Sequence, residues 1–186
     1  MIYGFLTTPV GRLLVARDPE GVRRIHFNGP RKGPAQAGPY VRTGDAPRPG
    51  WERHDRAFDD VATQLTEYFE GHRRTFELPL APEGTPFQMR VWNALREIPY
   101  GETISYGELA ARIGDRSASR AVGLANGSNP LPIVIPCHRV IGANGKLTGY
   151  GGGLPIKQQL LTLERGGRGL FDTNLGEPEG PPLRQG

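Results

Sequence analysis

The chain has 186 residues, with 23 Lys and Arg, 19 Asp and Glu and a single cysteine, and its formal net charge is +4. This length fits one large domain or two small ones. No run of about 18 apolar residues occurs, which excludes a transmembrane helix, so we expect no membrane partner. One cysteine excludes an internal disulfide and a thiolate-rich zinc site, and we expect no metal. The first residues lack the pattern of a signal peptide, so we expect an intracellular protein, in the cytoplasm and nucleoid or in the nucleus of a eukaryote.

Positive charge is densest around the cysteine. Residues 83–168 hold ten Lys and Arg against six Asp and Glu, whereas residues 1–82 hold twelve against ten. A basic surface of this kind suits an anionic partner such as a nucleic acid, although many solvated surfaces are equally basic.

The first 80 residues have the pattern of a small α/β domain. Three apolar segments within residues 2–27, separated by turn-forming residues, predict an antiparallel meander. Residues 28–50 contain five Gly and five Pro and predict a mobile loop. Apolar residues at helical spacing predict a helix over 54–70, and an alternating pattern predicts a final strand over 76–80. We find no catalytic pattern in this domain.

A junction at residues 81–84 leads into three predicted helices. Two capping boxes, which begin at Thr85 and Ser105, predict the starts of the first two helices. Ser117 is the predicted cap of a third helix over residues 118–126. Because the second and third helices are short and joined by a tight turn, they predict a helix-turn-helix.

The third of these helices consists mostly of small residues, with Arg120 as its one long cationic side chain. In soluble proteins such a helix more often packs tightly against another helix. The functional alternative is a helix pressed into a narrow DNA groove, where it reads few bases and Arg120 is its single probe.

The segment 133–141 contains the only cysteine, Cys137, with His138 directly after it. Three β-branched residues before Pro136 predict a short buried strand that ends at the cysteine. A lone buried cysteine is usually a small hydrophobe. As a nucleophile it needs a base, because a free thiol has a pKa of about 8.5. Successive strand residues point to opposite faces, so His138 would act through a water or a local kink.

The end of the chain contains a glycine-rich loop, a helix and a tail. Gly151–Gly153 allow flexibility or a close approach of a ligand to the backbone. The predicted helix begins at Pro155 and has Glu164 in its last turn. Residues 81–170 therefore form a mainly helical second domain, and residues 171–186 predict a disordered tail.

The cysteine segment is similar to the motif of the O6-alkylguanine-DNA alkyltransferases. Its Pro-Cys-His-Arg core, with Asn129 upstream and Tyr150 before three glycines downstream, is highly specific, and the similarity covers about residues 51–166. The resemblance implies an α/β fold with a small N-terminal α/β, ribonuclease H-like domain and a mainly helical, winged helix-turn-helix-like C-terminal domain. It implies a monomer that needs no cofactor and repairs double-stranded DNA containing O6-alkylguanine, by irreversible transfer of one alkyl group to the cysteine.

The resemblance also implies a role for each matching residue. Cys137 resembles the alkyl acceptor, His138 its base acting through a bridging water, and Glu164 the carboxylate that orients His138. Tyr106 resembles the donor of a proton to guanine N3, and Asn129 the residue that braces the site.

The remaining implied residues lie at the DNA and around the damaged base. Arg120 resembles a finger that enters the base stack when the damaged nucleotide flips out. The residues expected at the DNA are Ser105, Tyr106, Ser117, Ala118, Arg120, Ala121 and Gly123. The residues expected around the base are Tyr106, Cys137, Val140, Tyr150, Gly151 and Gly152. Among these, the backbone carbonyls of Cys137 and Val140 would accept from the guanine amino group, and the Gly151 amide would donate to O6.

Three other classes of protein compete with this interpretation. A non-catalytic, alkyltransferase-like protein binds lesions and recruits other repair factors, but such proteins lack the acceptor cysteine. A helix-turn-helix regulator needs a reading helix rich in Asn, Gln and Arg. A cysteine hydrolase needs a second activated water and turns over repeatedly.

Overall fold

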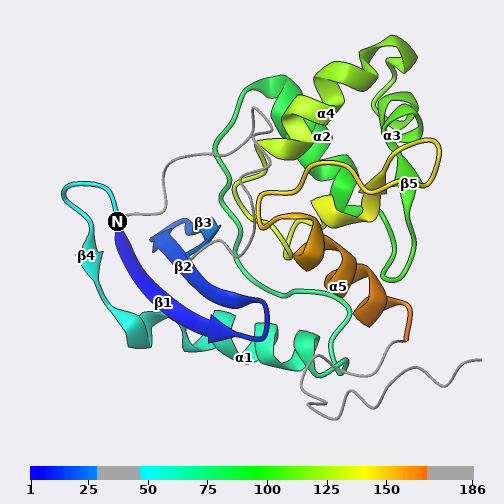
Figure 1. Ribbon diagram of the computed structural model, residues 1–186. Helices are drawn as coiled ribbons and strands as arrows, with labels where there is room; N and C mark the ends of the chain where they lie inside the picture. The colour runs from blue at the N-terminus through cyan, green and yellow to red at the C-terminus, as the bar shows by residue number, and fades with distance from the viewer. Residues whose placement is uncertain (29–46, 167–186) are drawn as a thin grey trace, which may run out of the picture.

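The computed structural model describes residues 1–28 and 47–166 (Figure 1). The predicted tail over 171–186 and most of the predicted loop over 28–50 lie outside these described residues. Figure 1 shows a small sheet and one helix at one end of the molecule and the other helices grouped at the opposite end. Among the helices in the two described ranges, none is long and apolar enough to cross a membrane.

The sheet has four strands in the order β3-β2-β1-β4. They are β1 (Ile2–Thr8), β2 (Gly11–Asp18), β3 (Gly21–Phe27) and β4 (Glu52–Arg53). The first three pair antiparallel, which confirms the predicted meander, and β4 joins β1 in parallel. Four successive residues of β2, Leu13–Ala16, are buried, as expected for an interior strand that is covered on both faces.

One helix, α1 (Asp59–Phe69), lies beside the sheet and follows a turn of 3-10 helix, η1 (Asp55–Phe58). Its buried residues are Val61, Leu65, Tyr68 and Phe69, which recur at the spacing of one helix face. The predicted helix is therefore confirmed. Gly71, with a φ of 78°, follows its end in the left-handed conformation that suits glycine.

The predicted strand over 76–80 is wrong except at its last residue. Leu80 forms one isolated parallel bridge with Val22, and the Val22 N–H donates to the Pro79 carbonyl at 2.7 Å. Pro79 has no amide hydrogen, so a regular ladder cannot continue through it. The alternating side chains instead pack against the core as partly buried residues.

The helical region begins at α2 (Pro86–Arg96), which is followed by β5 (Ile104–Ser105), α3 (Tyr106–Arg112) and α4 (Ser119–Gly127). Then come η3 (Cys137–Arg139), β6 (Val140–Ile141) and α5 (Leu154–Glu164). Both predicted capping boxes form, at Thr85 with Gln88 and at Ser105 with Glu108. The short strands β5 and β6 pair in parallel, which ties the start of α3 to the segment after the cysteine.

The predicted cap of the third helix is wrong. Ser117 lies inside a 3-10 turn, η2 (Arg116–Ala118), and α4 begins at Ser119 without a side-chain cap. The Asp115 carboxylate accepts from both the backbone N–H and the hydroxyl of Ser117, at 3.0 and 2.6 Å. A carboxylate is a stronger acceptor than a hydroxyl, so Asp115 caps the turn instead.

The predicted buried strand before Cys137 is also wrong. Ile133 has a φ of 75°, and the Ile135 N–H bonds back to the Leu131 carbonyl at 2.8 Å, so the chain makes a tight turn. Cys137 and His138 then lie in the 3-10 helix η3. Prolines on both sides of the β-branched residues restrict the backbone and withhold amide hydrogens, which prevents a strand ladder. A β-branched residue in the left-handed region is strained by about 1–3 kcal/mol.

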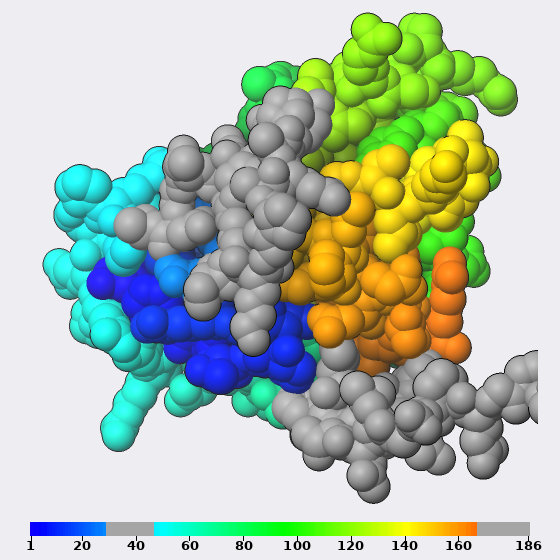
Figure 2. Space-filling model, in the orientation of Figure 1, coloured from blue at the N-terminus to red at the C-terminus, as the bar shows by residue number. Residues whose placement is uncertain are grey.

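The sheet and the helical region pack against each other around one continuous core. The Ile25 N–H in β3 donates to the Pro130 carbonyl at 2.8 Å, and the rings of Phe27 and Tyr150 lie 5.7 Å apart. Figure 2 shows the N-terminal strands and the C-terminal segment lying side by side on one face. Strand β3 therefore lies against the two segments that flank the cysteine.

Candidate active site

The cysteine lies in a buried position at the start of η3. Cys137 is 5% exposed, and burial raises the pKa of its thiol to about 11, although a hydrogen bond with Asn129 and the charge of Lys157 act in the opposite direction. At neutral pH the sulfur is therefore protonated. A nucleophilic role requires a base that removes this proton.

That base is available in the next residue. The His138 Nε2 atom lies 2.8 Å from Oε1 of Glu164, and both side chains are fully buried. Burial lowers the pKa of His138 below its ordinary value, even though Glu164 acts to raise it. The imidazole is therefore neutral at neutral pH and able to accept a proton.

The hydrogen bonds also fix which ring nitrogen is the base. A carboxylate can only accept, so the neutral imidazole carries its hydrogen on Nε2. Nδ1 is then the unprotonated nitrogen, and it is buried with no hydrogen-bond partner among the described residues. The arrangement has the logic of a nucleophile, a base and an orienting acid.

Glu164 is held by more than the histidine. Arg139 binds both of its oxygens, with Nε at 2.8 Å from Oε2 and Nη2 at 2.9 Å from Oε1. The Gly101 N–H donates to Oε2 at 3.1 Å, and the Tyr68 hydroxyl donates to Oε1 at 2.7 Å. Burial alone would raise the pKa of the Glu164 carboxyl, but the hydrogen bonds from His138 and Arg139 hold it well below its usual range. Glu164 is therefore ionised.

Two asparagines hold the backbone around the cysteine. The Asn129 amide donates to the Ile135 carbonyl at 2.8 Å, and its oxygen accepts from the Leu131 N–H at 3.0 Å. These bonds span the strained turn at Ile133. Asn126, on α4, is 3.4 Å from the carbonyl of Cys137 through its Nδ2 atom. The helix-turn-helix and the cysteine segment are thus connected through two side-chain amides.

A buried lysine holds the far side of the segment. The Lys157 Nζ atom on α5 donates to the carbonyl of Val140 at 2.6 Å and to that of Thr148 at 2.9 Å. Burial lowers the pKa of Lys157 to about 8. This lysine fixes the position of the Val140 carbonyl and of the loop that leads to Tyr150.

Three of the residues predicted to surround the base lie in the loop between β6 and α5, and Tyr106 lies beside it. The Tyr150 ring packs edge-on against His138, with ring centroids 6.4 Å apart, and its buried hydroxyl has no partner among the described residues. Gly151 is exposed, and Gly152 lies against the Phe27 ring, where an added Cβ would come within 3.0 Å. The Tyr106 hydroxyl, on α3, accepts from the Thr148 hydroxyl at 3.0 Å.

The predicted DNA-binding residues lie on β5, α3, η2 and α4. Arg120 and Ala121 are exposed, as are Ser117 and Leu124, and their spacing puts these four on one face. Ser105, Ala118 and Gly123 are half-buried. Gly123 faces the Tyr106 ring, since a Cβ there would lie 3.7 Å from it. The small residues therefore pack closely on one side of the helix, as the first interpretation predicts, and the other side is an exposed face.

Four residues of the site were missed by sequence reasoning: Tyr68, Asn126, Arg139 and Lys157. Lys157 could have been found, because it shares its helix face with Leu160, Leu161 and Glu164, at the spacing of a buried stripe. Arg139 belongs to the recognised motif, although its role was not assigned. Tyr68 gives no local signal, since its partner lies 96 residues further along the chain.

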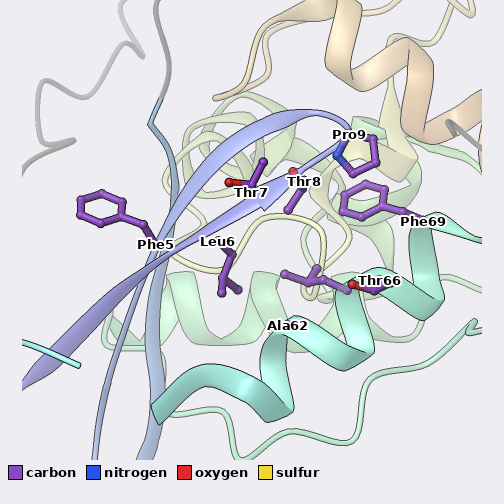
Figure 3. A pocket seen from close by; sticks show the side chains of 9 residues that line it. Phe5, Leu6, Thr7, Thr8, Pro9, Ala62, Thr66 and Phe69 are labelled. Carbon is purple, nitrogen blue, oxygen red and sulfur yellow. The ribbon is translucent and has the colours of Figure 1, made fainter. Parts of the chain in front are cut away.

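Two clefts described in the structure lie away from the cysteine. One, of about 210 Å³, is lined by the end of β1 and by α1 (Figure 3). The other, of about 410 Å³, lies where the C-terminal ends of α1 and α5 meet, and it includes Arg74, Tyr100 and Glu164. Neither is lined by Cys137. In residues 1–28 and 47–166 no cluster of His, Cys, Asp or Glu could hold a metal ion.

Two family models match the chain. Residues 1–82 match the ribonuclease-like domain of 6-O-methylguanine DNA methyltransferase, and residues 86–166 match its DNA-binding domain. The chain belongs to the 6-O-methylguanine DNA methyltransferase family. The two matched ranges correspond to the sheet region and the helical region of the fold.

Individual members of the family are similar to this chain over two thirds of its length or more. The chain is 49% identical over 164 residues to a methylated-DNA–protein-cysteine methyltransferase of Methanosarcina acetivorans, covering 88% of this chain and 98% of the relative. It is 59% identical over 124 residues to one of Mycolicibacterium paratuberculosis, covering 67% of this chain and 75% of the relative. A crystal structure of Mycobacterium tuberculosis OGT in complex with DNA matches with a TM-score of 0.80 and 43% identity, covering 92% of this chain and all of that one.

Proposed function

We propose that this protein repairs double-stranded DNA by transferring the alkyl group of an O6-alkylguanine to Cys137, once per molecule. The observation that carries the proposal is the buried series of Cys137, neutral His138 and ionised Glu164 in a chain of this family. A single monomer contains every residue that the reaction uses. Such a protein acts where the DNA is, in the cytoplasm and nucleoid or in the nucleus of a eukaryote.

The chemistry begins with removal of the thiol proton. His138 Nδ1 takes the proton of Cys137, through a bridging water if the two atoms do not meet directly, and Glu164 stabilises the imidazolium that forms. The thiolate attacks the alkyl carbon, a new S–C bond forms, and the bond between that carbon and guanine O6 breaks. The guanine anion takes a proton from the Tyr106 hydroxyl, and the proton that His138 took from the thiol then restores the Tyr106 hydroxyl by way of solvent. In the net reaction the thiol hydrogen replaces the alkyl group on guanine.

The reaction needs the damaged base outside the helix. O6 is enclosed in the duplex, so the nucleotide must flip, at a cost of a few kcal/mol of lost stacking. The exposed face of α4, with Ser117, Arg120 and Ala121, is suited to the minor groove, where binding does not depend on sequence. Arg120 fills the space that the flipped nucleotide leaves. Ser105, Ala118 and Gly123 complete the DNA-binding surface.

The flipped base is received between the cysteine and the Tyr150 loop. The Val140 carbonyl already accepts from Lys157, so its second lone pair is the one left for the guanine amino group. The Cys137 carbonyl already accepts from the Val140 N–H and from Asn126 Nδ2, so it would accept from the same amino group in place of the longer Asn126 bond. The exposed Gly151 amide offers a donor to O6. Tyr150 and Gly152 form the wall of this pocket, and Asn129 holds the turn that carries the cysteine.

A count of repaired lesions tests this function. Protein is mixed with an excess of duplex carrying one O6-methylguanine, and the guanine restored is measured against the protein added. We expect one lesion repaired per molecule, with no further repair on longer incubation. Cys137→Ala should repair none and should still bind the damaged duplex. Repair of more than one lesion per molecule would indicate a hydrolase. Repair by Cys137→Ala would contradict the proposed role of the cysteine.

A further inference from the structure

A tyrosine from the N-terminal region reaches into the proposed active site. Tyr68 lies near the end of α1, is completely buried, and donates its hydroxyl to Oε1 of Glu164 at 2.7 Å. Its ring is fixed by edge or tilted contacts with Phe69 and Phe76, each at 5.4 Å, and with Tyr100 at 6.1 Å. The hydroxyl therefore has a fixed direction, toward the carboxylate.

The oxygen that Tyr68 binds is the one that faces the base. Oε1 of Glu164 also accepts from His138 Nε2 at 2.8 Å and from Arg139 at 2.9 Å, whereas Oε2 accepts from Arg139 and the Gly101 amide. Donors on one carboxylate oxygen share its negative charge. The tyrosine hydroxyl thus competes with the imidazole for the charge that would stabilise an imidazolium.

The hydroxyl stays protonated under all ordinary conditions. Burial, and then the adjacent Glu164 charge, raise the pKa of Tyr68 well above its usual value. It is therefore a constant donor and not a switch. The Tyr150 hydroxyl differs from it, because it is buried and has no hydrogen-bond partner among the described residues.

We propose that Tyr68 is a positioning residue for the alkyl-acceptor site, which holds the Glu164 carboxylate in place and limits the negative charge that reaches His138. The role within alkyl transfer rests on the function proposed above. It makes the N-terminal domain a contributor to the chemistry, since this domain supplies one of the five hydrogen bonds that Glu164 accepts.

Several charged or titratable groups face this pair, and any pH experiment must take them into account. Glu164 is approached from α1, from η3 and from the loops around it, and His138 also faces α5. The groups concerned are Tyr68, Tyr100, Cys137, Arg139, Tyr150 and Lys157. Of these groups, only Tyr68 donates a hydrogen bond to Glu164 without carrying a formal charge.

The test compares Tyr68→Phe with Val61→Ala, which weakens the same helix at a buried position two turns before Tyr68. The pKa of His138 is measured by NMR of its ring in the unreacted protein, without DNA. We expect Tyr68→Phe to raise this pKa by about one pH unit, the equivalent of one hydrogen bond to a charged group. Val61→Ala should lower the melting temperature and leave the pKa of His138 unchanged.

A second substitution predicts the opposite sign and covers the case in which Tyr68→Phe does not fold. 3-Fluorotyrosine at position 68 is a stronger hydrogen-bond donor, so it should lower the pKa of His138. The rate of alkyl transfer at pH 7.5 should fall about three- to tenfold in Tyr68→Phe, as expected for a loss of about 1 kcal/mol of orientation.

The outcomes separate this inference from the proposed function. If neither substitution moves the pKa of His138, or if Val61→Ala moves it equally, Tyr68 has only a packing role. If the pKa values move as expected and the unmodified protein transfers no alkyl group, the positioning role stands and the proposed function does not.

Discussion

At the scale of single residues, the pKa values of the three ionisable groups in the site are shifted in directions that suit one another. Burial raises the pKa of Cys137 to about 11 and lowers that of His138, whereas hydrogen bonds outweigh burial and lower that of Glu164. At neutral pH the thiol is protonated, the imidazole neutral and the carboxylate ionised. In the proposed mechanism the reactive thiolate is formed only as His138 takes the thiol proton, which would protect the cysteine from other electrophiles.

The pH dependence of transfer follows from these directions. Below the pKa of His138 the imidazole already carries a proton and cannot act as a base. Because burial lowers that pKa below the ordinary value of about 6.5, the rate should be constant across neutral pH and fall only at a pH below this ordinary value. Single-turnover rates with free O6-benzylguanine between pH 5 and 9 measure this. A rate that rises tenfold for each pH unit across the whole range would mean that solvent, and not His138, ionises the thiol.

Removal of Arg139 should destabilise the fold. Arg139→Leu leaves the buried Glu164 without its bidentate partner, and breaking a buried pair in this way costs about 3–5 kcal/mol. Because the pKa of Glu164 is lowered in the folded state, its contribution is present above the unfolded value of about 4.5 and is lost as the pH falls below it. Urea unfolding at pH 7 and pH 4 measures both effects. Arg165→Leu, an exposed neighbour, should change the stability by less than about 0.5 kcal/mol, and an equal loss would contradict the pairing.

At the scale of elements, the sequence predicted what depends on local patterns. Both capping boxes, the meander and the helix face of α1 follow from the spacing of a few neighbouring residues. The turn before Cys137 was mistaken for a strand, because three β-branched residues outweighed the two prolines beside them. The turn at the left-handed Ile133 is spanned by the hydrogen bonds of Asn129, and an asparagine four residues earlier does not by itself predict a positive φ at a β-branched residue.

The exposed face of α4 yields a prediction at this scale. Arg120→Ala should impair repair of an O6-methylguanine duplex by at least tenfold and leave the reaction with free O6-benzylguanine within about twofold, because the free base needs no flipping. Arg116→Ala, an exposed cation in the preceding turn, is the matched control and should affect duplex repair much less. Equal losses on both substrates would show that Arg120 serves the site and not the flip.

At the scale of the whole molecule, the N-terminal region does more than cover the core. Tyr68 reaches Glu164, Ile25 bonds to the Pro130 carbonyl, and Phe27 lies against Tyr150 and Gly152. These contacts join residues far apart in the chain. The sequence contained all three residues on predicted strands and helices, but neither spacing nor composition indicates which distant segment each will meet.

The contact of Phe27 with the Tyr150 loop predicts a long-range effect on reactivity. Phe27→Ala removes the ring that packs against Tyr150, so the loop should lose its position and the transfer rate should fall about tenfold, with a stability loss of about 2 kcal/mol. Phe5→Ala is the control, because the Phe5 ring on β1 packs against Tyr3 and not against Tyr150. This substitution should leave the transfer rate unchanged. Transfer kinetics and thermal unfolding of both variants decide this, and equal rates in the two would contradict it.

The most direct test of the central claim is the mass of the intact protein after incubation with a duplex that carries one O6-methylguanine. The account predicts a gain of one methyl group per molecule, saturating at one, and peptide mapping should place it on Cys137. An unchanged mass despite tight binding to the lesion, or a methyl group on another residue, would contradict it.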